Sequence, residues 1–241
     1  LLFLQGCPLR CMYCHNPDSW KQEDFQEERT AEEILEMFDK YRKICSGGIT
    51  ISGGEPLMQK DFLSKLVHLF SKENIHTAID TAGSIPLNDS MQLIEDTSLF
   101  ILDIKHSNPQ KYHELTGGDL NITLANAKLL SDMGKKMWIR YVLVPGITDN
   151  TEDIKKEAEI IAELNGVEKV VVLPYSTLGR EKWKKLNYTY QLENTEPPSK
   201  ELLKSAKEIF KNAELPVSSG NREMKEIITD SCTVLTEKKS K

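Results

Sequence analysis

"LFILDIK", residues 99–105, is a short apolar run that ends in two charged side chains. Runs of this kind, nearly continuous in hydrophobicity, are typical of parallel strands buried on both faces of a sheet. The chain contains further runs of the same type. Together they predict six strands, over residues 1–5, 48–52, 75–80, 99–105, 136–144 and 169–175.

The segments between these runs have the apolar spacing of amphipathic helices. Thr30 with Glu33 has the spacing of a capping box, which predicts a helix start. The apolar face of this helix is predicted to comprise Ile34, Leu35, Phe38 and Tyr41. Asp61 is predicted to cap a second helix, with Phe62, Leu63, Leu66, Val67 and Phe70 facing inward. Further helices are predicted over 121–133, over 151–164 and after Ser199, the last with Leu202, Leu203, Ala206, Ile209 and Phe210 on one stripe.

This alternation of strands and helices predicts right-handed βαβ units and an α/β fold. Six repeats fit a partial (β/α)6 TIM-like barrel with parallel strands better than an open doubly wound sheet, although periodicity by itself leaves both open. In such barrels the chemistry lies at the C-terminal ends of the strands. Polar motifs follow the predicted strands at these ends: the cysteine cluster, "SGGEP", "DTAG", "DIK" and "LPYS", with Arg140 inside the fifth strand.

Composition limits the class of protein. The chain has 241 residues, of which 39% are hydrophobic, enough for one core of ordinary size. A net charge of −6 argues against a general nucleic-acid binder. No run reaches the length of a membrane span, and the clustered cysteines do not resemble the framework of a disulfide-stapled secreted domain. We therefore expect a cytoplasmic monomer that binds neither membrane nor nucleic acid.

The domain organisation is predicted to be simple. Residues 1–217 should form one domain, and the polar, lysine-rich stretch 218–241 a peripheral or mobile tail. The chain begins at Leu1 within an apolar run and without a methionine, so we expect a truncated N-terminus.

Three of the five cysteines, Cys7, Cys11 and Cys14, lie close together after the first predicted strand. A structural zinc site needs four ligands, and Cys45 and Cys232 are remote in sequence. A [4Fe–4S] cluster held by three thiolates of one loop would keep one iron open for a substrate or cofactor. A zinc site, or a fully ligated cluster with a fourth ligand from elsewhere, remains an alternative from the residues alone.

The motifs together resemble one enzyme family. "CPLRCMYC" has the Cys-x3-Cys-x2-Cys spacing of the radical S-adenosylmethionine (SAM) superfamily, whose members usually carry an aromatic residue at the position of Tyr13. The order and spacing of the later motifs resemble those of pyruvate formate-lyase activating enzymes, which activate glycyl radical enzymes. These motifs are "CMYCHNPDSW", "SGGEPLMQ", "DTAG", "LDIKH", "WIRYVLVPG" and "LPYSTLGREKW".

The resemblance implies an oxidoreductase of anaerobic metabolism. A [4Fe–4S] cluster on Cys7, Cys11 and Cys14 would bind the amino and carboxylate groups of S-adenosyl-L-methionine at its open iron. Reductive cleavage of this cofactor would produce a 5′-deoxyadenosyl radical, which removes a Cα hydrogen from a glycine in the loop of a partner glycyl radical enzyme. A flavodoxin or ferredoxin is implied as the reductant.

The resemblance also implies roles for the residues around this loop. The end of the second strand, with Gly53, Gly54 and Glu55, would bind the methionine ammonium. Asp80, Thr81 and Asp103 would lie beside the methionine carboxylate, in some members around a monovalent cation. Further cofactor contacts are implied for Tyr13, His15, Asn16, Lys105, Arg140 and the position of Ser176.

One position departs from the family pattern. Ser176 follows Leu-Pro-Tyr where pyruvate formate-lyase activators commonly carry a histidine, so activation of a different glycyl radical enzyme is an alternative. A non-catalytic iron–sulfur electron carrier or a zinc-stabilised module is another. An electron carrier or a zinc-stabilised module would not need Gly-Gly-Glu, Asp-Thr and Asp-x-Lys at successive strand ends. A third alternative keeps the radical chemistry but acts on a small molecule.

Overall fold

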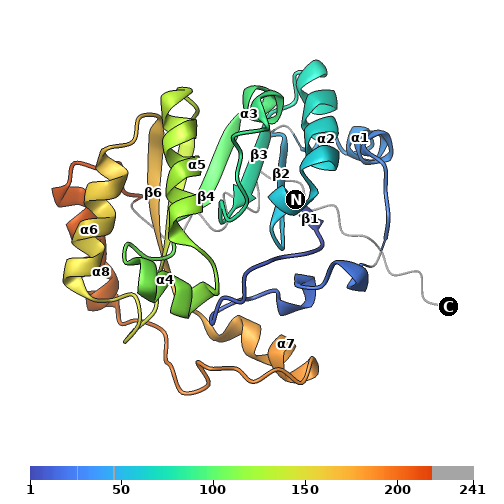
Figure 1. Ribbon diagram of the computed structural model, residues 1–241. Coiled ribbons are helices and arrows are strands. Elements are labelled where there is room, and N and C mark those ends of the chain that lie inside the picture. The colour runs from blue at the N-terminus through green and yellow to red at the C-terminus, as the bar shows by residue number, and fades with distance from the viewer. Residues whose placement is uncertain (26, 46, 219–241) are drawn as a thin grey trace.

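The computed structural model describes residues 1–25, 27–45 and 47–218 (Figure 1). Within these ranges six parallel strands form one sheet in the order β1-β2-β3-β4-β5-β6. The strands are β1 (Leu2–Leu4), β2 (Ile49–Gly53), β3 (Thr77–Thr81), β4 (Leu99–Asp103), β5 (Met137–Leu143) and β6 (Val167–Pro174). The sheet confirms the predicted partial (β/α)6 barrel.

Helices cover the outer face of the sheet and enclose the main core. They are α1 (Ala31–Asp39), α2 (Lys60–Lys72), α3 (Met91–Asp96), α4 (Pro109–Thr116), α5 (Leu120–Asp132), α6 (Thr151–Ala162), α7 (Arg180–Lys185) and α8 (Lys200–Asn212). Figure 1 shows α1, α2 and α3 toward one end of the sheet and α6 with α8 beside β6 at the other. The inward faces of α2 and α8 are those predicted from the sequence.

Local hydrogen bonds explain several helix starts. Thr30 and Glu33 form the predicted capping box, and Ser199 caps α8 by accepting from the Leu202 backbone N–H. The prediction for Asp61 was wrong: it lies in the first turn of α2, where an acidic side chain suits the helix dipole, and Gln59 occupies the N-cap. Tyr41 is also not on an apolar face, because α1 ends at Asp39 and the Tyr41 side chain is exposed.

Some short elements were not predicted individually. They include α3, α4 and α7, together with the 3-10 turns η1 (Pro17–Ser19), η2 (Gln22–Asp24), η3 (Pro56–Gln59) and η4 (Thr177–Gly179). Elements of one or two turns have too few residues to display a helical period. The start of α4 did carry a local signal, since Asn108 caps it and Pro109 occupies its first position.

The end of the described chain still belongs to the barrel. Val217 forms a parallel bridge with Val170 of β6, and the Ser218 backbone N–H donates to the Val170 carbonyl (3.0 Å). The predicted boundary at 217 remains a prediction, since residues 219–241 of the predicted tail lie outside the described residues. Of the helices in the described ranges, none combines the length and apolarity needed to cross a membrane.

Candidate active site at the carboxyl ends of the strands

The predicted polar motifs meet at one end of the sheet. Asp80 and Thr81 end β3, and Asp103 ends β4. Arg140 lies in β5 directly beside Asp103 in the strand register. Parallel strands place their carboxyl ends at the same edge, so motifs far apart in sequence come together there.

A buried ion network joins these strand ends. Arg140 Nε donates to Asp103 Oδ1 (2.6 Å), and its guanidinium also donates to Asp80 Oδ1. Lys105 Nζ donates to the second oxygen of Asp103 (3.0 Å). Ser52 Oγ, on β2, donates to Asp80 Oδ2 (2.8 Å). Arg140 therefore points into the barrel, toward both carboxylates.

Burial and charge act in opposite directions on this network. Burial alone would raise the pKa of Asp103, but Arg140 and Lys105 outweigh it and hold that pKa at about 2. Burial raises the pKa of Asp80, and the neighbouring Asp103 carboxylate adds to the effect, while Arg140 only partly compensates. The pKa of Lys105 is raised because its acidic neighbours overcome burial. Two cations and a firmly ionised carboxylate thus line the site at neutral pH.

The cysteine loop follows β1 and is anchored on the end of α4. The backbone N–H groups of Arg10 and Met12 donate to the Thr116 and Leu115 carbonyls (2.7 and 3.0 Å). Arg10 Nη1 donates back to the Cys7 carbonyl (2.7 Å). These bonds hold the loop in place even though it has no regular secondary structure of its own.

The three thiols of this loop are free and largely withdrawn from water. Burial raises the pKa of Cys7 to about 11 and that of Cys11 to about 12, and it also raises the pKa of Cys14. The Lys105 ammonium opposes the shift at each of them. A bound metal centre would ionise these thiols directly, since a coordinating thiol loses its proton.

The residues of the cysteine loop suit an iron–sulfur cluster. In the described part of the chain, no three His, Cys, Asp or Glu side chains converge closely enough to hold a single metal ion. A cubane cluster makes a different demand, because its thiolates bind separate irons. Free thiols on one short loop, backbone hydrogen bonds to Cys7 and Cys14 from Leu9 and Asn16, and the nearby Lys105 charge all suit an anionic iron–sulfur group.

The two glycines at the end of β2 are required by backbone packing. A Cβ on Gly53 would lie 2.2 Å from the Leu4 carbonyl oxygen, and one on Gly54 would lie 2.2 Å from that of Gly6. Gly53 also has a φ of +121°, which non-glycine residues rarely adopt. These contacts let β2 approach β1 and the start of the cysteine loop; a role toward a ligand remains a prediction.

Glu55 ties the end of β2 to the end of β3. Its side chain is 1% exposed. Within the described residues, it accepts hydrogen bonds from Thr81 Oγ1 (2.5 Å), the Ala82 backbone N–H (3.0 Å), Ser84 Oγ (3.3 Å) and the Leu57 backbone N–H (3.1 Å). It therefore orders the "DTAG" turn, and its predicted contact with a cofactor remains untested.

The other predicted residues lie around the cysteine loop. Tyr13 is buried, its hydroxyl has no hydrogen-bond partner among the described residues, and Lys105 Nζ lies 5.7 Å from its ring centroid. His15 Nε2 lies 3.2 Å from both the carbonyl oxygen and the hydroxyl of Ser176. Asn16 Oδ1 accepts from Lys182 Nζ (2.9 Å). Ser176, which departs from the family pattern, therefore lies beside His15 of the cysteine loop.

Comparison with known proteins identifies the family. A profile of the Radical SAM superfamily matches residues 1–158. The chain belongs to the radical SAM superfamily. Among curated proteins, the "Pyruvate formate-lyase-activating enzyme" of Staphylococcus epidermidis is 44% identical over 229 residues, covering 90% of this chain and 91% of the relative. The protein of the same name from Staphylococcus aureus (strain USA300) is 43% identical over 216 residues, covering 86% of each chain.

Solved structures support the fold. A domain of a pyruvate-formate lyase-activating enzyme from Bacteroides vulgatus superposes with a TM-score of 0.61 at 22% identity, covering 73% of this chain and 99% of that domain. Streptococcus suis SuiB bound to S-adenosylmethionine gives a TM-score of 0.68 at 17% identity, covering 91% of this chain and 49% of SuiB. At these identities the likeness establishes the radical SAM barrel alone.

Three residues that position parts of the site in this radical SAM chain were not predicted from the sequence. Ser52 holds Asp80. Trp183, within the quoted motif "LPYSTLGREKW", donates its indole N–H to the Cys14 carbonyl (2.8 Å). Asn126 of α5 donates to the Gly83 and Ile85 carbonyls and accepts from the Leu87 N–H. The buried asparagine had no sequence signal, because its partners lie about 40 residues away.

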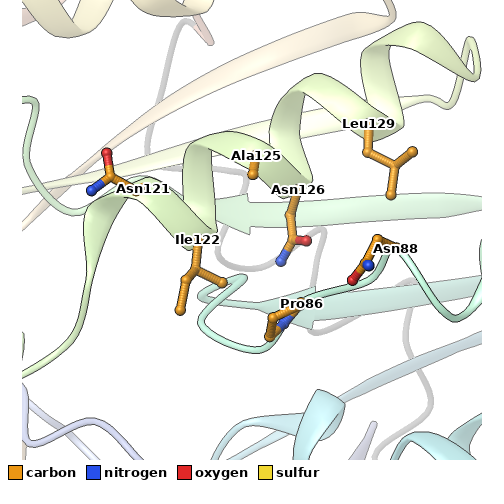
Figure 2. Close-up of a pocket in the computed structure, with 7 residues that line it drawn as sticks. All are labelled: Pro86, Asn88, Asn121, Ile122, Ala125, Asn126 and Leu129. Atoms are coloured by element: carbon orange, nitrogen blue, oxygen red, sulfur yellow. The ribbon is translucent and has the colours of Figure 1, made fainter.

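A groove of about 330 Å³ lies between α5 and the segment of residues 86–88 (Figure 2). It is lined by Pro86, Asn88, Asn121, Ile122, Ala125, Asn126 and Leu129. Figure 2 shows Ile122, Asn126 and Leu129 of α5 on the side of the helix that faces Pro86 and Asn88. None of the predicted site residues lines this groove, so it is separate from the candidate active site.

Proposed function

We propose that this chain is a pyruvate formate-lyase-activating enzyme. It would cleave S-adenosylmethionine reductively and remove a Cα hydrogen from one glycine of its partner, which then carries a glycyl radical. The observation that carries the proposal is the 43–44% identity to relatives of that name over most of both chains. The free cysteine loop beside the buried ion network supports it.

Each part of the site has a distinct task in this proposal. Cys7, Cys11 and Cys14 would hold a [4Fe–4S] cluster with one open iron, and the bound cluster supplies the electron that cleaves the sulfonium. Lys105, whose positive charge lowers the pKa of each thiol, would stabilise their negative charge. Arg140 would keep Asp80 and Asp103 in fixed positions at the strand ends, where the resemblance places the methionine carboxylate.

Several finer features belong to the same proposal. A flavodoxin or ferredoxin would deliver the electron, since both are one-electron donors of low potential. A monovalent cation beside Asp80, Thr81 and Asp103 would be a further partner of the methionine carboxylate. We also propose a cytoplasmic location, because the three clustered free thiols suit a reducing compartment. In this proposal the chain acts as a monomer.

The first test is spectroscopic. Anaerobically reconstituted, reduced protein should give the electron paramagnetic resonance (EPR) signal of a [4Fe–4S]⁺ cluster, and this signal should change when S-adenosylmethionine is added. A signal that does not change would favour a fully ligated cluster and the electron-carrier interpretation.

Cysteine variants test the ligand set. Replacing Cys7, Cys11 or Cys14 with alanine should abolish iron loading or cofactor cleavage, because an open-iron site needs all three thiolates. Cys45→Ala serves as the control, since Cys45 belongs to the main core and not to the loop; its unfolding midpoint is measured first, because Cys45 is disulfide-bonded. A fully active single variant of the loop would contradict the assignment.

Partner identity needs a separate test. Incubation with pyruvate formate-lyase, a reductant and S-adenosylmethionine should produce a glycyl radical signal on the partner. The absence of that signal, together with an active cofactor-cleaving protein, would indicate a different glycyl radical enzyme. Ser176, in place of the histidine common in the family, makes this comparison worthwhile.

A further inference from the structure

A segment from the far end of the barrel closes over the cysteine loop. Residues 176–192 follow β6 and include η4 and α7; we call them the clamp. Figure 1 shows α7 next to the N-terminal segment that carries η1. Since β1 and β6 are the two ends of the sheet order, the clamp bridges strands that are not neighbours in the sheet.

The central contact of the clamp is made by Trp183. Its indole Nε1–H donates to the carbonyl oxygen of Cys14 over 2.8 Å, across 169 positions in sequence. The Trp183 side chain is 5% exposed. Its ring packs edge-on against Trp20 (5.0 Å between centroids) and lies 5.1 Å from that of Tyr190. Packing on several sides therefore holds the indole in one orientation.

Other clamp residues hold the positions around Cys14. Lys182 Nζ donates to Asn16 Oδ1 (2.9 Å) and to the Asp18 carboxylate (3.0 Å). Gly179 packs directly on the loop, because a Cβ there would lie 2.6 Å from the Cys14 carbonyl oxygen. The clamp thus contacts the peptide that follows the third thiol from two sides.

These contacts bear on the direction of the Cys14 side chain. The carbonyl of a residue and its Cα–Cβ bond are attached to the same Cα, so a hydrogen bond that fixes the carbonyl also limits where the thiol points. Outer partners of this kind orient metal ligands, and their loss typically costs about 10- to 100-fold in metal affinity or activity.

We propose that Trp183 is a positioning residue for the Cys14 thiolate, and that the clamp sets how firmly the loop holds its iron–sulfur cluster. This inference rests on the proposed function, because it requires that the loop bind a cluster. The indole N–H acts through the Cys14 backbone and touches neither substrate nor cofactor.

The decisive variant is Trp183→Phe, which keeps an aromatic ring in the packed site and removes the N–H donor. The control is Trp138→Phe, the same chemical change on β5, where Lys169 Nζ lies 4.1 Å from the indole centroid. Both proteins are reconstituted anaerobically. The measurements are the EPR spectrum of the reduced cluster and the rate of iron loss to a ferrous chelator.

We expect Trp183→Phe to shift the EPR g-values and to lose iron roughly 10-fold faster than the unaltered chain, while Trp138→Phe changes neither. A Trp183→Phe protein with the unaltered spectrum and rate would overturn the inference and leave the proposed function intact. Failure of the unaltered chain to take up any cluster would overturn both.

A second pair of variants covers the case in which Trp183→Phe does not fold. Lys182→Met removes the partly exposed ammonium that ties Asn16 and Asp18 to the clamp. Lys184→Met is the matched control on the same helix: within the described part of the chain the Lys184 ammonium forms no hydrogen bond or ion pair, while its backbone carbonyl accepts from the Asn187 N–H. We expect iron loss to be roughly two- to fivefold faster in Lys182→Met; equal rates in the two variants would overturn the inference.

Discussion

Two regions of the barrel bury carboxylates in opposite ways. At the strand ends, Asp80 and Asp103 lie against Arg140 and Lys105. On α6, Glu157 is 0% exposed, and neither of its carboxylate oxygens has a hydrogen-bond partner among the described residues. The first arrangement pairs each buried carboxylate with a cation, whereas the second leaves the carboxylate without a partner among the described residues.

The difference arises from the elements that carry these residues. Asp103 and Arg140 are direct neighbours in the register of β4 and β5, so a cation on one strand reaches the acid on the next. Glu157 instead occupies the inward stripe of α6, together with Ile154, Ala158 and Ile161. Burial raises the pKa of Glu157 well above its ordinary value, and Asp153 adds to the shift. A strand end can therefore place a cation beside a buried acid, whereas Glu157 has no ion pair within the described residues.

The largest effect is expected from Arg140→Met. This change leaves Asp80 and Asp103 buried without their shared guanidinium, so the free energy of unfolding at pH 7 should fall by about 3–5 kcal/mol. Urea unfolding measures it. Arg42→Met, which breaks exposed pairs with Asp39 and Glu73, should cost less than about 1 kcal/mol. Similar losses of unfolding free energy in both variants would mean that the buried ion pairs of Arg140 stabilise the protein no more than the exposed ion pairs of Arg42 do.

Glu55→Gln tests a third way of burying a carboxylate, in which neutral groups donate hydrogen bonds to it. Thr81 and Leu57 donate to one carboxylate oxygen of Glu55, and Ala82 and Ser84 donate to the other. Glutamine replaces one of these oxygens with an NH2 group, which cannot accept, so one of the two pairs of hydrogen bonds is lost. We expect the free energy of unfolding to fall by about 2–3 kcal/mol. The exposed Glu36→Gln on α1 is the control and should have almost no effect. An unchanged midpoint in Glu55→Gln would show that these bonds contribute little.

Glu157→Met should act in the opposite direction. Methionine fills a similar volume and removes a buried polar group without partners, so the free energy of unfolding at pH 8 should rise by about 1–2 kcal/mol. Exposed Glu159 on the same helix supplies the control Glu159→Met. A loss of stability in Glu157→Met would mean that the carboxyl has a compensating partner.

The smallest effect concerns pH. The folded-state pKa of Glu157 is raised, so its contribution to stability is complete below the unfolded value of about 4.3 and is lost as pH rises through the folded value. Between pH 4 and 8, the difference in unfolding free energy between Glu157→Met and the unaltered chain should therefore grow with pH, by less than about 1.4 kcal/mol per pH unit. Parallel curves would exclude titration of this group.

The pH behaviour of Asp103 should have the opposite sign. Its folded-state pKa is held at about 2, so its stabilising contribution is present above the unfolded value of about 3.9 and is lost as pH falls below that value. The contribution of Asp103 is thus lost as pH falls, and that of Glu157 is lost as pH rises. One series of unfolding measurements across pH can therefore separate the two effects.

Much of the fold was predictable because its signals are local. The apolar runs placed every strand to within a few residues, and the capping box at Thr30 marked the start of α1. The polar motifs were placed at the correct strand ends for the same reason. The prediction of Asp61 as a cap failed because several residues near a helix start suit its dipole, and only the backbone angles choose among them.

The strand-end position of the candidate site was predictable, and its contacts were less so. The strand-end motifs predicted a site that includes Asp80 and Asp103, and the structure brings these two residues together around Arg140. The sequence did not reveal that Glu55 turns toward Thr81 and Ala82, because that direction depends on how the turn after β3 lies against η3.

By itself, the sequence determined the alternation of strands and helices, the strand-end placement of the motifs and the cysteine loop, since hydrophobic period and turn chemistry act over a few neighbouring residues. Only the tertiary structure decided that Arg140 points inward between two carboxylates, and that Trp183 reaches Cys14. Both contacts join residues far apart in the chain. Their geometry depends on strand register and on the packing of the clamp against the cysteine loop, which no local pattern encodes.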